Sequence, residues 1–113
     1  MNIQIFGTSK SFDTKKAQRY FSERKIKFQY VDLRERQLSR GEWNSVKSAV
    51  GGWEKLFDEN GKNKELITLV KYLTPEAKEE KIFENQELLK MPIVRNGRQA
   101  TAGYAPEVWQ TWE

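Results

Sequence analysis

Residues 1–24, MNIQIFGTSKSFDTKKAQRYFSER, predict a β-strand, a loop and an α-helix in that order. Polar and apolar residues alternate over residues 2–6, which is typical of a strand, and residues 7–12 have the composition of a loop. A pattern of helical period then starts at Asp13, the expected N-cap, and runs to about Arg24. Backbone N–H groups of such a loop point at whatever lies above the helix N-terminus, where the helix dipole favours an anion or a thiolate.

Ser11 is the residue of this loop that is best placed to use the field of the helix. Its hydroxyl donates and accepts hydrogen bonds, but it is a weak nucleophile unless a strong base stands beside it. The same field would promote ionisation of a cysteine. The loop is therefore suited to a thiol, although the sequence contains no cysteine.

The composition limits the chemistry of the chain further. Its 113 residues fit one domain, 1–113, and the lack of Cys and His excludes disulfides, thiol chemistry and the usual zinc sites, so we expect no metal. The net charge is +4, but the basic residues alternate with acidic residues along most of the chain, and no nucleic-acid-binding motif is present. We therefore expect no direct binding of nucleic acid. No long apolar run suggests a membrane span or a leader, so we expect a cytoplasmic location. We also expect a monomer.

A second strand is predicted at residues 28–33, where apolar and polar residues alternate again. The short link at residues 25–27 then makes a βαβ unit with two parallel strands and a right-handed crossover. A helical insertion follows at about residues 38–89. Its first helix starts with a capping box of Ser39 and Glu42 and buries Trp43, Val46 and Val50.

Two more helices are predicted in the insertion. Residues 65–73 place four apolar side chains on one face: Leu66, Leu69, Val70 and Leu73. Thr74 caps the next helix, which has Pro75 at its first position and runs to about Leu89. Residues 78–81 of this helix, Lys-Glu-Glu-Lys, are expected to form a solvated face with charge pairs inside the helix.

The end of the chain predicts a β-hairpin and a closing helix. Residues 91–95 and 99–103 flank Asn96-Gly97, the strongest short hairpin signal. The helix at residues 106–112 is expected to bury Val108 and one of Trp109 and Trp112. The order βαβ, insertion, ββα predicts an α/β fold with a four-stranded mixed sheet and flanking helices. The loop at residues 7–12 would then lie at the carboxyl end of the first strand, where open α/β sheets bind ligands.

Three segments resemble the ArsC/Spx family of thioredoxin-like proteins, which includes arsenate reductases and the Spx transcription regulators. Residues 7–17, GTSKSFDTKKA, are similar to the active-site segment of that family, and Met91-Pro92-Ile93-Val94 to its segment with a cis-proline. Gly103-Tyr104 is similar to a Gly-aromatic pair before the last helix. The resemblance covers essentially the whole chain and implies a thioredoxin-like fold.

The resemblance also implies a site. It places Ser11 at the position of the family's catalytic cysteine. In the family that cysteine attacks arsenate, and glutathione and glutaredoxin resolve the resulting adduct. The residues expected to bind substrate around it are Thr8, Lys10, Phe12, Lys15, Pro92 and Arg95. Serine cannot complete the redox cycle because that cycle needs a sulfur. The arginines of the arsenate reductases are also replaced, by Met91, residues 58–60 and about Tyr104, so this chain is predicted not to reduce arsenate.

Several alternatives stay open at this point. The serine at position 11 is either a deliberate substitution of cysteine or a natural loss of the nucleophile. With a thiol there, glutathione or a thiol-containing protein would be the partner and glutaredoxin a possible reductant, with no bound cofactor. The second hypothesis is an Spx-like regulator that binds RNA polymerase, although Thr14 stands where the second cysteine of an Spx switch would be. The third is a non-catalytic domain of unknown partner.

Overall fold

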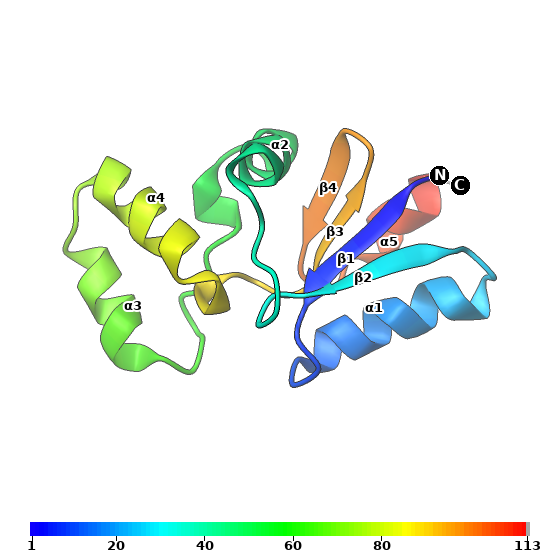
Figure 1. The fold of residues 1–113 in the computed structure, drawn as a ribbon, viewed down its shortest axis with the longest axis horizontal. Helices are drawn as coiled ribbons and strands as arrows, with labels where there is room; N and C mark the ends of the chain where they lie inside the picture. Colours follow the sequence, from blue (N-terminus) through cyan, green and yellow to red (C-terminus); the bar gives the residue numbers. More distant parts are fainter. Residues whose placement is uncertain (113) are drawn as a thin grey trace.

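The computed structural model describes residues 1–112, and Glu113, the last residue of the predicted domain, lies outside the described residues. A four-stranded mixed sheet with the order β2-β1-β3-β4 forms its centre (Figure 1). β1 runs parallel to β2 and antiparallel to β3, which pairs with β4 in the predicted hairpin. The strands are β1 (Ile3–Gly7), β2 (Phe28–Asp32), β3 (Ile93–Asn96) and β4 (Gln99–Ala102). The predicted fold class is confirmed.

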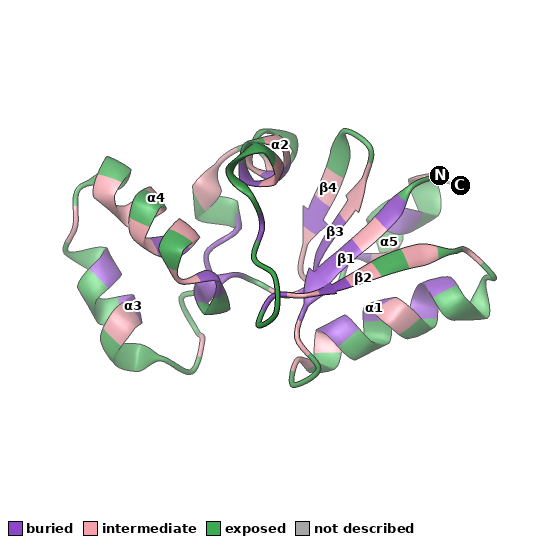
Figure 2. Cartoon of the chain, viewed as in Figure 1, coloured by how far each residue is buried: buried purple, intermediate pink, exposed green. Residues whose placement is uncertain are grey.

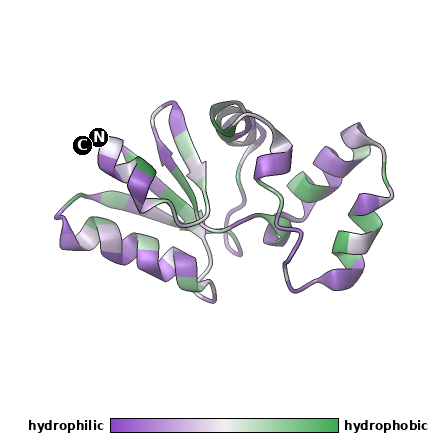
Figure 3. Ribbon diagram, turned by 180° about the vertical axis from the view of Figure 1, so that it is seen from behind, coloured by the Kyte–Doolittle hydropathy of each residue, from purple (hydrophilic) through white to green (hydrophobic). Residues whose placement is uncertain are grey.

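The alternation of β1 separates two hydrophobic clusters on opposite faces of the sheet. Ile3 and Ile5 pack with residues of α1 (Phe12–Glu23) and with Trp109 of α5 (Pro106–Trp109). Phe6 belongs to the cluster on the other face, which the helical insertion covers. Figure 2 shows buried residues along β1 and β3, the two central strands. In Figure 3 the helices carry both hydrophobic and hydrophilic positions, as expected for helices with one face on the core.

α1 begins one residue earlier than predicted, and its N-cap is Ser11 instead of Asp13. The Ser11 hydroxyl oxygen accepts a hydrogen bond from the backbone N–H of Thr14 at 3.2 Å. Asp13 lies in the first turn, where its negative charge suits the helix dipole without capping. The predicted N-cap was therefore wrong by two residues because a serine and an aspartate compete for this role over so short a distance.

The helical insertion lies between β2 and β3. Its elements are α2 (Arg40–Val50), the 3₁₀ turn η1 (Trp53–Lys55), α3 (Lys64–Lys71), α4 (Pro75–Glu84) and the 3₁₀ turn η2 (Gln86–Leu88). The capping box of Ser39 and Glu42 is confirmed, as are the Thr74 cap and Pro75 at the start of α4. α4 ends at Glu84, five residues before the predicted end, because Asn85 leaves the helical conformation at φ −133° and ψ 73°.

Two predicted buried faces differ from the structure. α3 buries Ile67 and Val70, which join the same core cluster as Ile82 of α4, whereas Leu69 is 47% exposed. Leu66 is half-buried and packs against the same cluster, so the face that meets the core includes Leu66, Ile67 and Val70 and leaves Leu69 outside. At the C-terminus Trp109 is fully buried and Val108 is 38% exposed, because the larger ring fills the space between α1 and the sheet. α5 continues into the 3₁₀ turn η3 (Gln110–Trp112).

The glutamates of α4 pair with α2 instead of forming a solvated face with pairs inside the helix. Glu79 accepts hydrogen bonds from Trp43 Nε1 at 2.8 Å and from Lys47 Nζ at 2.7 Å. Arg40 and Glu80 form a second bridge at 2.8 Å. These contacts fasten α4 to α2 and hold the insertion together at one end of the sheet (Figure 1). None of the helices in residues 1–112 combines the length and the apolar run that a membrane crossing needs.

Candidate active site

The start of α1 lies directly against the end of β1. Gly7 ends the strand, and a Cβ on Gly7 would lie only 2.7 Å from Thr14 Cγ2. The loop between them closes with a hydrogen bond from the Ser11 backbone N–H to the Thr8 carbonyl oxygen at 3.1 Å. A residue without a side chain at position 7 thus allows the helix to approach the strand closely. As a result, the first turn of α1 and Ser11 lie at the carboxyl end of β1.

The Ser11 side chain points at the N-terminus of α1, because its oxygen receives the Thr14 N–H. A sulfur in the same rotamer would lie against the same donor and would gain from the partial positive charge of the helix end. The hydroxyl gains less, since the chain contains no histidine that could act as its base. The geometry therefore suits a thiolate better than the serine that is present.

Ser11 also lines a surface cleft of about 500 Å³. One wall comes from the loop after β1 and the start of α1, and the other comes from the insertion and the segment before β3. The residues that line it include Thr8, Lys10, Ser11, Phe12, Asp58, Lys62, Glu87, Leu88, Leu89 and Met91. Phe12 is 82% exposed at the rim, so a large apolar surface stands next to Ser11. The cleft thus joins two parts of the chain that are 80 residues apart in sequence.

The Met91–Pro92 peptide bond is cis, as the resemblance implies. Met91 faces the cleft, while Pro92 is buried behind it and its carbonyl oxygen accepts a hydrogen bond from the Gly103 N–H at 2.8 Å. This bond joins the segment before β3 to the loop after β4. Met91 is therefore the residue of this segment that faces a ligand in the cleft.

The structure brings together four of the residues that the sequence placed in the site: Thr8, Lys10, Ser11 and Phe12. Lys15 is exposed on α1 outside the cleft lining. Arg95 lies in the interior of β3, where its guanidinium donates to Gln4 at 3.3 Å and to Ser45 at 3.2 Å. Those two partners lie away from the cleft, and Arg95 is not among the residues that line it.

Arg34 lines the cleft and was missing from the sequence-based set. It follows β2 by two residues and donates to Asp32 and to the Ser9 hydroxyl, which belongs to the loop after β1. The hydrogen bonds from Arg34 hold the pKa of Asp32 below its usual value. Only the spacing of Asp32 and Arg34 could have signalled this contact, and that spacing does not reveal Ser9 as the third partner.

The charges around the cleft are balanced. Lys10, Arg34 and Lys62 contribute positive charge, and Asp13, Asp58 and Glu87 contribute negative charge. Residues 1–112 contain no group of three acidic side chains that could hold a metal ion. An anion in this cleft must therefore be recognised by particular donors, because the summed field is weak.

A model of the ArsC family matches residues 6–112, from the end of β1 to the last turn of the described chain. The chain belongs to the ArsC family. Its sheet order, cis Met91–Pro92 bond and helical insertion are thus the ArsC-family version of the thioredoxin-like fold.

Solved structures share this ArsC-family fold at low sequence identity. The YffB protein has a TM-score of 0.84 and 20% identity, with 96% of each chain covered. An arsenate reductase from Vibrio cholerae has a TM-score of 0.81 and 19% identity over 98% of this chain and 97% of that one. An arsenate reductase-related protein from Brucella melitensis has a TM-score of 0.67 and 16% identity, with 99% and 94% covered. A comparison with curated proteins gave no match.

Proposed function

We propose that this ArsC-family chain has the framework of a thiol-dependent reductase of the arsenate reductase type, with position 11 as the site of the nucleophile. The observation that supports this proposal best is the double role of Ser11. Its side chain caps α1 at 3.2 Å from the Thr14 nitrogen, and it lines a cleft shared with Met91 of the cis peptide. A side chain that only capped the helix would not need to face a cleft.

With serine at this position the chain is inactive in thiol chemistry, because a hydroxyl forms no disulfide. The proposed ligand is glutathione or a thiol-containing protein, which the cytoplasm would supply. Arsenate is a poorer candidate for this chain, since the cleft presents Met91 and Asp58 where the arsenate reductases carry arginine and its charges are balanced. The proposed site residues are Ser11 as the nucleophile position, with Thr8, Lys10, Phe12 and the Met91–Pro92 segment around the ligand.

The Ser11→Cys variant tests this proposal with glutathione disulfide. Its thiolate would attack one sulfur of the disulfide, a new S–S bond would form as the old one breaks, and the second glutathione would leave as a thiolate. We expect a mixed disulfide by mass spectrometry, and its reduction by glutaredoxin. Ser48→Cys, on the exposed side of α2, is the control for an ordinary surface thiol. Equal rates for the two variants would contradict the proposal.

The alternative of an Spx-like regulator is tested with the same variant. Neither position 11 nor position 14 is a cysteine, so the chain as it stands has no redox switch there, and Thr14 is instead fully buried against Gly7. A Ser11→Cys variant that is inert toward glutathione disulfide, together with binding of the unmodified chain to purified RNA polymerase, would favour the regulator over the reductase. Turnover of arsenate with glutathione and glutaredoxin by that variant would favour the reductase.

A further inference from the structure

Arg34 is the cation of the cleft whose position the structure fixes. Its Nε donates to Asp32 Oδ1 at 3.2 Å, and its Nη2 donates to Asp32 Oδ2 at 3.0 Å and to Ser9 Oγ at 2.7 Å. Asp32 also accepts the backbone N–H of Arg34 at 2.9 Å. The guanidinium is therefore held against both the end of β2 and the loop that carries Ser11.

This arrangement leaves one amino group of the guanidinium, Nη1, available. A guanidinium has five N–H donors in a planar fork, and the three on Nε and Nη2 account for the contacts with Asp32 and Ser9. The two donors on Nη1 have no partner among residues 1–112, and the side chain is 49% exposed. Arg34 lines the cleft beside Ser11 and also the adjoining hollow of about 410 Å³ that it shares with Thr8 and Met91.

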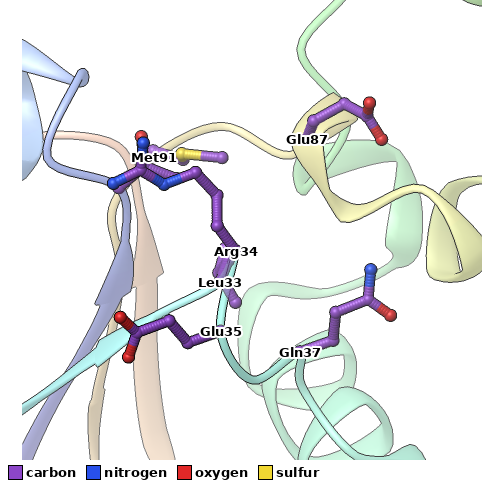
Figure 4. A pocket seen from close by; sticks show the side chains of 7 residues that line it. Leu33, Arg34, Glu35, Gln37, Glu87 and Met91 are labelled. Atoms are coloured by element: carbon purple, nitrogen blue, oxygen red, sulfur yellow. The ribbon is translucent and has the colours of Figure 1, made fainter.

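The other charged groups at the cleft offer less for recognition of an anion. Lys10 and Lys62 form no ion pair or side-chain hydrogen bond within the described chain, so binding would have to order their flexible side chains. Figure 4 shows Arg34 extending toward Met91, whereas the carboxylate of Glu87 points away from Arg34. A carboxylate next to Nη1 would thus meet a charged donor group whose position is already fixed.

We propose that Arg34 binds a carboxylate of the thiol ligand and so sets the preference of the cleft for anionic thiols of the glutathione type. This inference deepens the proposed function and rests on it, because the ligand is taken to place its sulfur at position 11. Arg34 has a second, positioning effect through Ser9, which fixes the loop before α1. The ion pair with Asp32 keeps the guanidinium in place, and the free Nη1 group supplies the specificity.

The test uses the unmodified serine chain and binding alone. Glutathione is titrated against the labelled protein and backbone amide shifts are followed by NMR, in parallel with glutathione diethyl ester, which has no free carboxylate. We expect glutathione to shift the amides of residues 8–12 and 34 and to bind at least about fivefold more tightly than the ester. Arg34→Gln should remove this preference, and Arg34→Lys should restore only part of it, because a flexible lysine ammonium is not held in place by Asp32 and Ser9.

Arg98→Gln, in the exposed turn between β3 and β4, is the matched loss of one positive charge elsewhere and should leave the preference unchanged. Equal affinity for glutathione and its ester in the unmodified chain would overturn the inference even if Arg34→Gln did not fold. Equal preference in Arg34→Gln and the unmodified chain would overturn it as well. The proposed function is tested separately. It fails if Ser11→Cys reacts with glutathione disulfide no faster than Ser48→Cys, which this titration does not measure.

Discussion

Thr14 occupies the space into which a side chain on Gly7 would project. A Cβ at position 7 would lie 2.7 Å from Thr14 Cγ2 and 3.0 Å from Thr14 Cβ, and Thr14 is fully buried. The contact joins the last residue of β1 to the first turn of α1. It therefore fixes the distance between the sheet and the helix N-terminus on which the candidate site depends.

Gly7→Ala should consequently destabilise the fold. We expect a loss of about 1–3 kcal/mol in the free energy of unfolding, because the added methyl group overpacks a closed contact. Chemical denaturation of Gly7→Ala, Thr14→Ala and the double variant checks this as a double-mutant cycle. The cost of Gly7→Ala should shrink when Thr14 is already Ala. Additive losses would show that the two side chains do not compete for the same space.

The buried side chain of Gln86 stabilises one wall of the cleft through hydrogen bonds in the protein interior. Its side chain is 1% exposed, accepts from the Leu38 N–H at 2.7 Å and donates to the Leu38 and Phe83 carbonyl oxygens at 3.1 Å each. Gln86→Leu should lower the free energy of unfolding by about 2–4 kcal/mol, because it leaves these buried backbone groups without partners. Gln37→Leu, at an exposed position, is the control and should change stability by less than about 0.5 kcal/mol. A neutral Gln86→Leu would contradict the assignment.

The lowered pKa of Glu42 predicts a contribution to stability that is lost in acid. The hydrogen bonds from Arg36 and then from Ser39 lower its pKa from 4.5 to about 2. A pKa that is lower in the folded state stabilises the fold above pH 4.5, and this contribution is lost as the pH falls from 4.5 to about 2. Glu42→Gln keeps an oxygen that can accept from the Ser39 N–H, so it should cost only about 1 kcal/mol at pH 7 through the lost charge pair with Arg36, and it should flatten the stability curve over that interval. Thermal unfolding of the unmodified chain and of Glu42→Gln is measured from pH 7 to pH 2. Parallel curves of stability against pH for the two proteins would contradict the prediction.

Glu79 joins α4 to α2 within the insertion. Lys47 first, and then Trp43, lower its pKa by donating hydrogen bonds to the carboxylate. Glu79→Ala should reduce the free energy of unfolding by about 1 kcal/mol, because the indole N–H and the ammonium lose their shared acceptor. Glu76→Ala, at an exposed position in the first turn of the same helix, should cost less. Equal losses would show that the bridge contributes no more than helix propensity.

Local signals explain most of what the sequence predicted correctly. The alternation in β1, the Ser39–Glu42 capping box and the Asn96-Gly97 turn each act within a few residues, so they determine their elements without knowledge of the fold. The end of α4 and the buried face of α3 depend on which neighbours cover them. Those two features were therefore predicted wrongly.

The candidate site divides in the same way. Thr8, Lys10, Ser11 and Phe12 are adjacent in the chain, so one motif predicted a wall of the cleft. The opposite wall comes from residues 58–63 and 87–91, whose approach to Ser11 depends on how the insertion folds back. Arg34 was missed for a similar reason, since its contact with Ser9 spans 25 residues and has no local pattern.

The pKa of a thiol at position 11 tests the central claim most directly. The rate of alkylation of Ser11→Cys by iodoacetamide is measured against pH, with Ser39→Cys as the matched control. Ser39 caps α2 with the same 3.2 Å contact, but its backbone N–H faces the Glu42 carboxylate and no described cleft includes it. We predict a pKa for Ser11→Cys at least about one unit below the ordinary 8.5 and below that of Ser39→Cys. A pKa near 8.5 at position 11 would contradict the assignment of Ser11 as the nucleophile position.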